Sequence, residues 1–352
     1  MREIITSKLV TCQIHCDRLL TSKCPGTAAT PGKMPPFGYS RNEFRRDTLT
    51  RVTSSERGPD QMNAVISTPS AGGYRLIPAD VGIGLCPEHH ALVLDQQPQV
   101  AWFEVRAETL LARGDWLREV ESVGRDYPLS VHSGGLSLGS ATRPDATYLG
   151  RLSELLIRLQ PDLVSDHLSW STVEGIHLSD ALTSVVRNVA HVQDTLKRQI
   201  LLENSFKSLD LADAALSEES FLAEVVLRTG CGVVLDLNNL HSSATELGSN
   251  ANAVLNRFLE ALEPESIAEI RLAGCSGSVA SIDNHGSHIG AAVWELFERA
   301  IAAIGPVPTL LKWDTGIPAF RVLQAEATTA RSILTNSTRQ AACATRSAGL
   351  QP

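Results

Sequence analysis

The chain has 352 residues, of which 43% are hydrophobic and 20% are charged, so most of it can bury a core. Its formal net charge of −8 argues against binding a nucleic-acid backbone as the main role, because such proteins are usually basic. Its sequence has no apolar run long enough to span a bilayer, so we expect no membrane-embedded segment and no membrane partner.

Residues 1–75 differ from the rest of the chain because Ser, Thr, Pro, Gly and Arg predominate without a sustained hydrophobic period. We expect a disordered or poorly ordered extension, or a translation start placed too early, with Met62 as the native beginning. A small metal site is disfavoured, since the spacing of the candidate ligands matches no strong zinc pattern; they are Cys12, His15, Cys16 and Cys24. Residues 336–352 are expected to form a flexible polar tail.

Between these ends, residues 76–335 alternate short β-rich runs with helical segments, which indicates βα units and a parallel sheet. Eight runs are predicted as strands: Asp80–Leu85, Val100–Arg106, Leu129–His132, Leu163–His167, Ile200–Glu203, Val233–Leu237, Ile267–Leu272 and Thr309–Trp313. The predicted helices are Tyr148–Leu159, Ala181–Leu196, Glu218–Thr229, Ala251–Leu262 and Ala291–Ile304. This count predicts an α/β fold, a closed (β/α)8 TIM barrel of the xylose-isomerase-like kind. A doubly wound open sheet is the alternative, but no glycine-rich dinucleotide motif supports it.

The predicted strands repeatedly end in polar residues that are able to do chemistry. They include Glu104, His132, Asp166, His167, Glu203, Asn204, Asp236, Asn238, Asn239, Arg271 and Lys312. In a barrel these ends share the face on which the active site is built. Burying many such groups is unfavourable unless they are paired or bind a cation. Any one of them is more often a hydrogen-bonded structural residue than a ligand, but their joint occurrence favours a metal site. Two His with a carboxylate suit non-haem iron, and manganese or zinc remain open.

From Gly82 to about Leu334 the chain resembles the multinuclear non-haem iron-dependent oxidative enzymes, a family that includes the iron oxygenases of methanobactin and thiaglutamate biosynthesis. The motifs that carry the resemblance are Gly82–Leu85, Pro87–His89, Tyr127–His132, Leu136–Gly139, Ser165–Trp170, Leu201–Asn204, Arg228–Asn239, Leu272–Gly274, Ile282–Gly286 and Trp313–Asp314.

The resemblance implies a barrel holding one to three non-haem irons. By motif match the expected ligands are His132, His167, Glu203, Asn238, Asp283 and His285. Asp166 and Asp314 are expected to be catalytic, Asp166 as an auxiliary ligand or a support for the ligands. The family oxidises cysteine or other residues of ribosomally made precursor peptides with dioxygen. A partner protein often delivers the peptide.

The sequence departs from the family pattern at two expected ligand positions. Arg271 stands where the family has a histidine, and Lys312 stands where it has a glutamate. Neither can take over the lost role, since arginine has no acceptor and lysine would have to lose its proton. Our hypothesis is that one iron position is vacated, and that Arg271 and Lys312 neutralise the carboxylates left there. A site around His132, His167 and Glu203 would remain.

Three functions are compatible with these residues. The first is an iron-dependent peptide-modifying oxidase with a reduced metal set. The second is a catalytically degenerate relative that binds a peptide or a partner protein. The third is a divalent-metal enzyme resembling sugar isomerases, although the motifs fit it less well. The seven scattered cysteines, an odd number, favour reduced thiols and a cytoplasmic protein over a disulfide framework.

Overall fold

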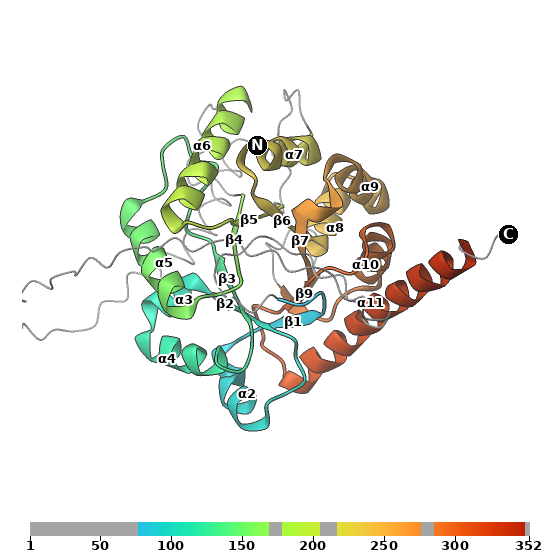
Figure 1. The fold of residues 1–352 in the computed structure, drawn as a ribbon, viewed down its shortest axis with the longest axis horizontal. Helices are drawn as coiled ribbons and strands as arrows, with labels where there is room; N and C mark the ends of the chain where they lie inside the picture. Colours follow the sequence, from blue (N-terminus) through green and yellow to red (C-terminus); the bar gives the residue numbers. More distant parts are fainter. Residues whose placement is uncertain (1–76, 169–177, 205–216, 276–284, 349–352) are drawn as a thin grey trace, which may run out of the picture. The chain divides into compact units, whose positions relative to one another are not determined.

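The computed structural model describes residues 77–168, 178–204, 217–275 and 285–348 (Figure 1). The predictions for residues 1–75, including the four candidate ligands near the N-terminus, lie outside the described residues. So does the predicted ligand Asp283. None of the described helices is long and apolar enough to cross a membrane.

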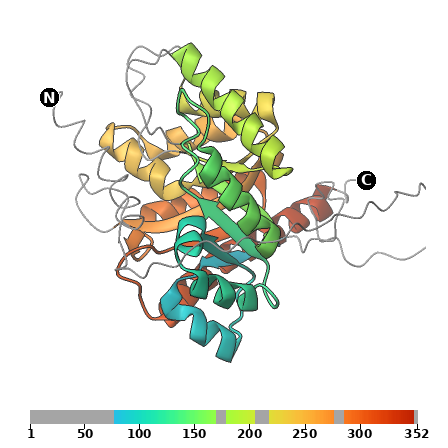
Figure 2. The same ribbon diagram turned by 90° about the vertical axis from the view of Figure 1, so that its left-hand side faces the viewer.

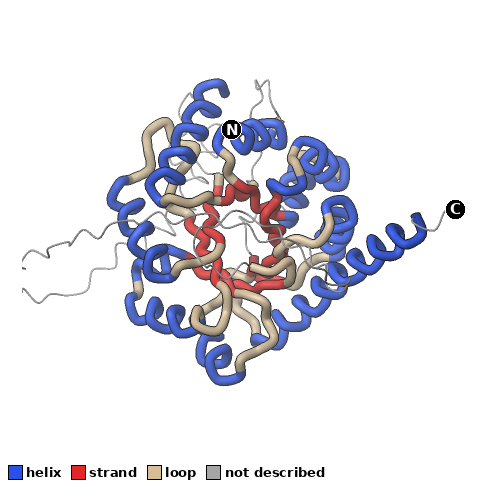
Figure 3. Tube along the Cα trace, viewed as in Figure 1, coloured by secondary structure: helices blue, strands red, loops and turns tan. Residues whose placement is uncertain are grey.

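Parallel strands form the predicted closed barrel, and Figure 3 shows them as an inner ring surrounded by helices. They are β1 (Val81–Gly84), β2 (Phe103–Arg106), β3 (Leu129–Ser133), β4 (Leu163–His167), β5 (Leu201–Glu203), β6 (Gly232–Asp236), β7 (Ile267–Cys275) and β9 (Thr309–Lys312). Successive strands pair from β1 to β7, β7 pairs β9, and β9 pairs β1, which closes the ring. The short β8 (His285–Ser287) is antiparallel to the end of β7. The prediction of a closed barrel is therefore confirmed, and the alternative prediction of a doubly wound open sheet is wrong.

The helices lie along the outside of the strands, as the side view in Figure 2 shows. They are α2 (His90–Gln96), α3 (Ala107–Ala112), α4 (Gly114–Val123), α5 (Ala146–Leu159), α6 (Leu178–Leu196), α7 (Glu218–Thr229), α8 (Leu237–Glu246), α9 (Ala251–Ala261), α10 (Ala291–Ile304) and α11 (Phe320–Ala348), with the 3₁₀ turns η1 (Pro87–His89) and η2 (Pro264–Ser266).

Helix α5 illustrates why these segments are helical. The carboxylate of Asp145 caps its start by accepting a hydrogen bond from the Tyr148 backbone at 2.7 Å. Leucines at helical spacing, such as Leu152 and Leu156, are buried against the barrel. The helix ends at Gln160, whose backbone is left-handed with φ 47°.

Strand register determines which side chains face the barrel interior. His132 on β3 is level with Arg106 on β2 and with Ser165 on β4, while His167 is level with Glu203 on β5. Residues that are level with each other on paired parallel strands project to the same side of the sheet. Along one strand, every second residue projects to that side. The inward row therefore contains, among others, Glu104, Arg106, His132, Ser165, His167, Glu203, Asp236, Glu269, Arg271 and Lys312.

Nearer the amino ends of the strands, the interior is filled by bulky apolar groups placed against glycines. A Cβ on Gly82 would lie 2.3 Å from the indole of Trp102, and one on Gly232 would lie 2.5 Å from a methyl of Leu201. Glycine at these positions makes room for the large side chains. The lower interior is thus closed by packing, and the polar row lies toward the carboxyl ends of the strands.

The C-terminal segment differs from the expected tail. Helix α11 continues past Asn336 to Ala348, so residues 336–348 are helical, and the flexibility expected of this tail stays a prediction. The segment contains no proline or glycine that would end a helix, and its alanines favour one. The hydroxyls of Thr335 and Thr338 bond the carbonyls four residues earlier, so the polar residues are compatible with the helix.

Candidate metal centre at the carboxyl ends of the strands

Three neighbouring strands bring His132, His167 and Glu203 together at the mouth of the barrel. One potential ligand atom from each residue lies within 4.8 Å of the others. Among the described residues, these three therefore form a group that could hold a metal ion. The side chains of His132 and Glu203 are fully buried, whereas His167 retains 28% of its exposure. The structure therefore places these three predicted ligands in one cluster, with access from the His167 side.

The distances within this cluster suit a single ion. The Nε2 atoms of His132 and His167 are 3.0 Å apart. Two nitrogens that each lie about 2.1 Å from one ion, at a right angle to each other, would be separated by about 3.0 Å. Glu203 Oε2 lies 3.7 Å from His132 Nε2, whereas its 3.4 Å contact with His167 is to Nδ1, the ring nitrogen that does not face His132. One ligand atom from each of the three residues lies within 4.8 Å of the others. Two imidazoles and one carboxylate fit a divalent transition metal with open positions.

The protonation of His132 also suits metal binding. Burial holds the pKa of His132 well below its usual range, and the nearby Arg271 cation acts in the same direction. The ring is therefore neutral at physiological pH, which is the form that coordinates metals. Its Nδ1 lies 2.8 Å from the hydroxyl of Ser165, a contact that fixes the ring with Nε2 toward His167.

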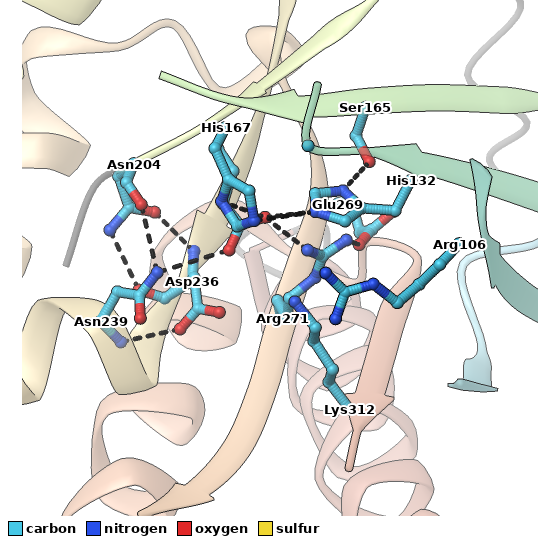
Figure 4. Close-up of polar contacts among 12 residues, drawn as sticks. Arg106, His132, Ser165, His167, Asn204, Asp236, Asn239, Glu269, Arg271 and Lys312 are labelled. Atoms are coloured by element: carbon cyan, nitrogen blue, oxygen red, sulfur yellow. Dashed lines mark hydrogen bonds and ion pairs between the residues drawn. The ribbon is translucent and has the colours of Figure 1, made fainter. Parts of the chain in front are cut away.

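Arg271 occupies the barrel interior beside this cluster and is itself fully buried (Figure 4). Its guanidinium donates to Glu203 Oε2, to Glu104 Oε2 at 2.6 Å and to Glu269 Oε1 at 3.0 Å. Burial alone would lower the pKa of Arg271, but the three carboxylates more than offset this and hold it above its usual value. A fixed positive charge thus stands where the sequence comparison expects a histidine ligand.

The carboxylates around Arg271 outnumber it. Burial raises the pKa of Glu269 to about 8, against the opposing effect of Arg271. Burial also raises the pKa of Glu104, again opposed by Arg271 and by Lys312. The neutral form of Glu269 is therefore favoured at physiological pH. A carboxylic acid in that place limits the excess negative charge in the barrel interior.

Lys312 behaves differently from Arg271. Its side chain is 5% exposed, and its Nζ lies 3.6 Å from Asp314 Oδ2. Arg106 Nη1 lies 3.7 Å from the same carboxylate oxygen. The predicted catalytic residue Asp314 is thus placed between two cations at the mouth. The hypothesis that both Arg271 and Lys312 neutralise the inner carboxylates is supported by direct contacts for Arg271, whereas the ion pair of Lys312 faces Asp314.

A second hydrogen-bond network fixes Glu203 from the side of β6 (Figure 4). The amide of Asn239 donates to Glu203 Oε1 at 3.4 Å and to the Asn204 carbonyl at 3.3 Å. Asp236 caps α8 by accepting from the backbone N–H of Asn239 at 2.8 Å. The predicted ligand Asn238 is buried in the first turn of the same helix. Its role as a ligand stays a prediction.

Asp166 faces away from the cluster. It is level with Ser133 on β3, so it projects to the outer side of the sheet while its neighbour His167 projects inward. Its Oδ2 accepts from the backbone of Leu136 at 3.2 Å, and burial raises its pKa well above the usual value. The expected catalytic role as an auxiliary ligand does not fit this orientation, but a supporting role for the loop after β3 does.

His285 begins β8, opposite Cys275 at the end of β7. Its side chain lies outside the described set, so its assignment as a ligand stays a prediction, as does that of Asp283.

Glu269 and Ser165 were not singled out from the sequence, and Glu104 was counted among the polar strand ends without a role of its own. Each of these residues lies two positions before another inward polar residue on the same strand, and this spacing could have revealed it. The pairs are Glu104 and Arg106, Glu269 and Arg271, and Ser165 and His167. Recognising it requires knowing which face of each strand is inward, and that depends on the register of the closed barrel.

Comparison with known proteins identifies the relatives of this barrel. Residues 80–335 match the family described as RiPP precursor modification enzyme MbnB/TglH/ChrH. The chain belongs to this family. A member from Chromobacterium violaceum, a UPF0276 protein, is 40% identical over 268 residues, covering 73% of this chain and 96% of that one. A UPF0276 protein from Caulobacter sp. strain K31 is 42% identical over 270 residues, with the same coverage.

Solved structures support the fold of the family barrel. Endonuclease IV from Thermus thermophilus superposes with a TM-score of 0.50 at 14% identity, covering 74% of this chain and 99% of that one. A xylose isomerase domain-containing protein from Salmonella typhimurium gives 0.50 at 11% identity, with 76% and 99% covered. At these identities the likeness shows a shared barrel architecture, and the xylose-isomerase-like fold is confirmed.

Proposed function

We propose that this protein is an iron-dependent oxidase that modifies a cysteine-type residue of a ribosomally made precursor peptide, and that it works with a single metal. Membership of the precursor-modification family supports the substrate class. The observation that carries the reduced metal set is the position of Arg271, whose guanidinium bonds the Glu203 carboxylate of the His132–His167–Glu203 cluster. A second ion there would face a fixed positive charge.

The cluster would hold the metal through His132, His167 and Glu203. When bound, non-haem iron supplies redox chemistry with dioxygen that side chains do not provide. The chain's own part is to keep the ligands in place. Ser165 orients the His132 ring, while Arg271 and Asn239 hold the two oxygens of Glu203. Because these groups are buried, water is largely excluded from one side of the cluster, and the substrate approaches from the more exposed His167.

Arg271 has a second effect on such a centre. By hydrogen bonding Glu203 it draws negative charge away from the carboxylate, which weakens that ligand compared with a free one. It also supplies the positive charge that a second ion would bring to Glu104 and Glu269. We expect the chain to hold one ion firmly and to fold without a second or third ion.

Oxygen consumption tests this function. The full chain, loaded with ferrous iron, is mixed with short cysteine-bearing peptides while dissolved oxygen and peptide mass are followed. We expect oxygen uptake and a mass change on the peptide that both disappear in His167→Ala. His191→Ala, at a half-buried histidine of α6, is the matched control and should retain both.

Peptide binding without oxygen uptake would contradict the oxidase proposal and identify a binding protein of the same family. Uptake that survives His167→Ala would contradict the assigned metal cluster.

A further inference from the structure

Gly134 is a glycine at the mouth of the barrel that neither backbone conformation nor packing requires. It directly follows β3, it is half-buried, and its φ lies outside the left-handed region that favours glycine. Among the described residues, the nearest atoms to a Cβ built on it would be His167 Cδ2 at 3.8 Å and Glu108 Oε1 at 4.0 Å. These are ordinary contact distances, so the fold would accept an alanine. Gly135 differs, because a Cβ there would lie 2.6 Å from the Tyr148 ring.

The space left by the missing side chain borders the metal cluster. His167 Cδ2 is bonded to Nε2, the ring nitrogen that lies 3.0 Å from His132 Nε2. His167 is also the member of the cluster that keeps 28% of its side-chain exposure, whereas His132 and Glu203 are fully buried. The space therefore lies beside the ligand that a substrate can reach.

The backbone around this space is held in place, so the loop after β3 cannot readily move to fill it. Glu108 Oε1 accepts a hydrogen bond from the Gly134 N–H at 2.9 Å and another from the Tyr148 hydroxyl at 2.5 Å. Farther along the loop, the side-chain amide of Asn188 donates to three backbone carbonyls at 2.9 to 3.0 Å. They belong to Leu138, Ser140 and Thr142. The space beside His167 is thus a fixed feature of the mouth.

We propose that Gly134 is a specificity-determining residue that leaves room beside His167 for the main chain of the peptide substrate at the modified residue. This deepens the proposed function and rests on it for the substrate class. The sulfur of a cysteine is separated from its Cα by a single methylene, so a thiol held at the cluster brings the peptide main chain next to the ligands. Glycine at position 134 provides the room for it, and a larger side chain would take that room.

Thiol binding to the zinc-loaded full chain tests the proposal apart from oxidation, because zinc has no redox chemistry and accepts the same ligand types. The probes are N-acetylcysteine methylamide, which has main-chain amides on both sides, and mercaptoethanol, which has none. Calorimetry under argon measures the binding of both. We expect Gly134→Val to weaken binding of the blocked cysteine about ten- to a hundredfold, and Gly134→Ala about three- to tenfold, because their side chains fill the space. Mercaptoethanol should bind all three proteins within about twofold.

Two controls separate exclusion of the substrate from damage to the site. Zinc content should be the same in Gly134→Ala as in the unchanged chain, and the urea midpoint after chelation should not fall, because the added methyl group meets no close contact among the described residues. Gly150→Ala, within α5, is the matched glycine control, since a Cβ there meets nothing within 4 Å. It should bind both thiols as the unchanged chain does.

Unchanged binding of the blocked cysteine by Gly134→Val would overturn the proposal, and so would an unchanged chain that does not bind this probe. Equal weakening of both thiols, or loss of zinc, would also overturn it, because the side chain would then act on the metal and not on the main chain of the substrate. If Gly134→Val fails to fold, the contrast between the two thiols in Gly134→Ala decides. Size-dependent exclusion without oxygen uptake by the iron-loaded chain would refute the oxidase function while supporting this role of Gly134.

Discussion

At the scale of single residues, the account depends on one buried arginine. Arg271 is fully buried, and its guanidinium bonds three carboxylates from three parts of the barrel wall. Such a group adds little net stability compared with apolar residues of similar size, but removing one partner leaves charges buried without compensation. The protein should therefore be sensitive to loss of this cation.

Arg271→Met should lower the free energy of unfolding by about 3–5 kcal/mol, because Glu104 and Glu203 would lose their shared cation and Glu269 would lose its hydrogen-bond donor. Urea unfolding in the presence of a chelator measures this change in the free energy of unfolding. Arg158→Met, at an exposed arginine on α5, should change it by less than about 1 kcal/mol. A chain that tolerates Arg271→Met as well as Arg158→Met would show that Arg271 does not compensate the carboxylates.

Glu269 gives a prediction for pH. Its pKa is raised from 4.5 to about 8 by burial, so the folded chain keeps the proton that the unfolded chain releases near its ordinary pKa. The resulting stability is fully present below about pH 4.5 and is lost as pH rises toward 8. Glu269→Gln mimics the neutral acid and has no proton to lose. The variant should therefore gain stability over the unchanged chain progressively between these values.

Unfolding free energies at pH 5 and pH 8.5 would measure that gain, with the metal removed in both chains. The histidines also titrate in this range, but they are common to both proteins and cancel in the difference. A constant difference between the two proteins at both pH values would mean that Glu269 is ionised in the fold.

At the scale of elements, the strands and helices follow closely from hydrophobic pattern. The bounds of α7 and α10 are those expected, and the strand ends supplied His132, His167 and Glu203. The expected sixth strand runs one residue too far, because Asp236 caps α8 and so turns Leu237 into the first residue of a helix. A local pattern could not show this, since Val233–Leu237 is apolar enough for either structure.

The limits of the sequence are clearest for contacts across the barrel. The hypothesis that Arg271 compensates a vacated metal position came from the family resemblance, which expects a histidine there, together with the charge of arginine. Its partner Glu104 could not be predicted, because Glu104 lies on β2, which does not pair with β7, and only the closed barrel brings the two side chains together. Glu269 precedes Arg271 by two residues on β7, but its contact with Arg271 requires knowing that both face inward. Likewise, the outward face of Asp166 depends on its pairing with Ser133, which residue spacing alone does not give.

Close packing at the amino ends of the strands predicts a contrast between two glycines. Gly82→Ala would place a Cβ 2.3 Å from the Trp102 indole and should destabilise the fold by about 1–3 kcal/mol. Gly150→Ala, within α5, meets nothing within 4 Å and should stabilise it by about 0.5–1 kcal/mol. Thermal unfolding of both variants is the measurement. A stabilising Gly82→Ala would refute the packing of Trp102 over β1.

At the scale of the whole molecule, the barrel separates a packed lower interior from a charged upper one. The lower part closes the barrel around Trp102 and Leu201, while the upper part gathers the metal cluster, the Arg271 network and the cations of the mouth. The family fold is thus retained around an altered charge pattern. The chain belongs to a family of precursor-modifying enzymes, but two of its buried inward positions, Arg271 and Lys312, carry positive charge.

The metal content of the purified full chain tests the central claim most directly. After anaerobic loading with ferrous iron and removal of excess, we predict one tightly held ion per chain, lost in His132→Ala and increased in the double variant Arg271→His with Lys312→Glu. Three tightly held irons in the unchanged chain, or no increase in the double variant, would contradict the claim that Arg271 occupies the place of a metal.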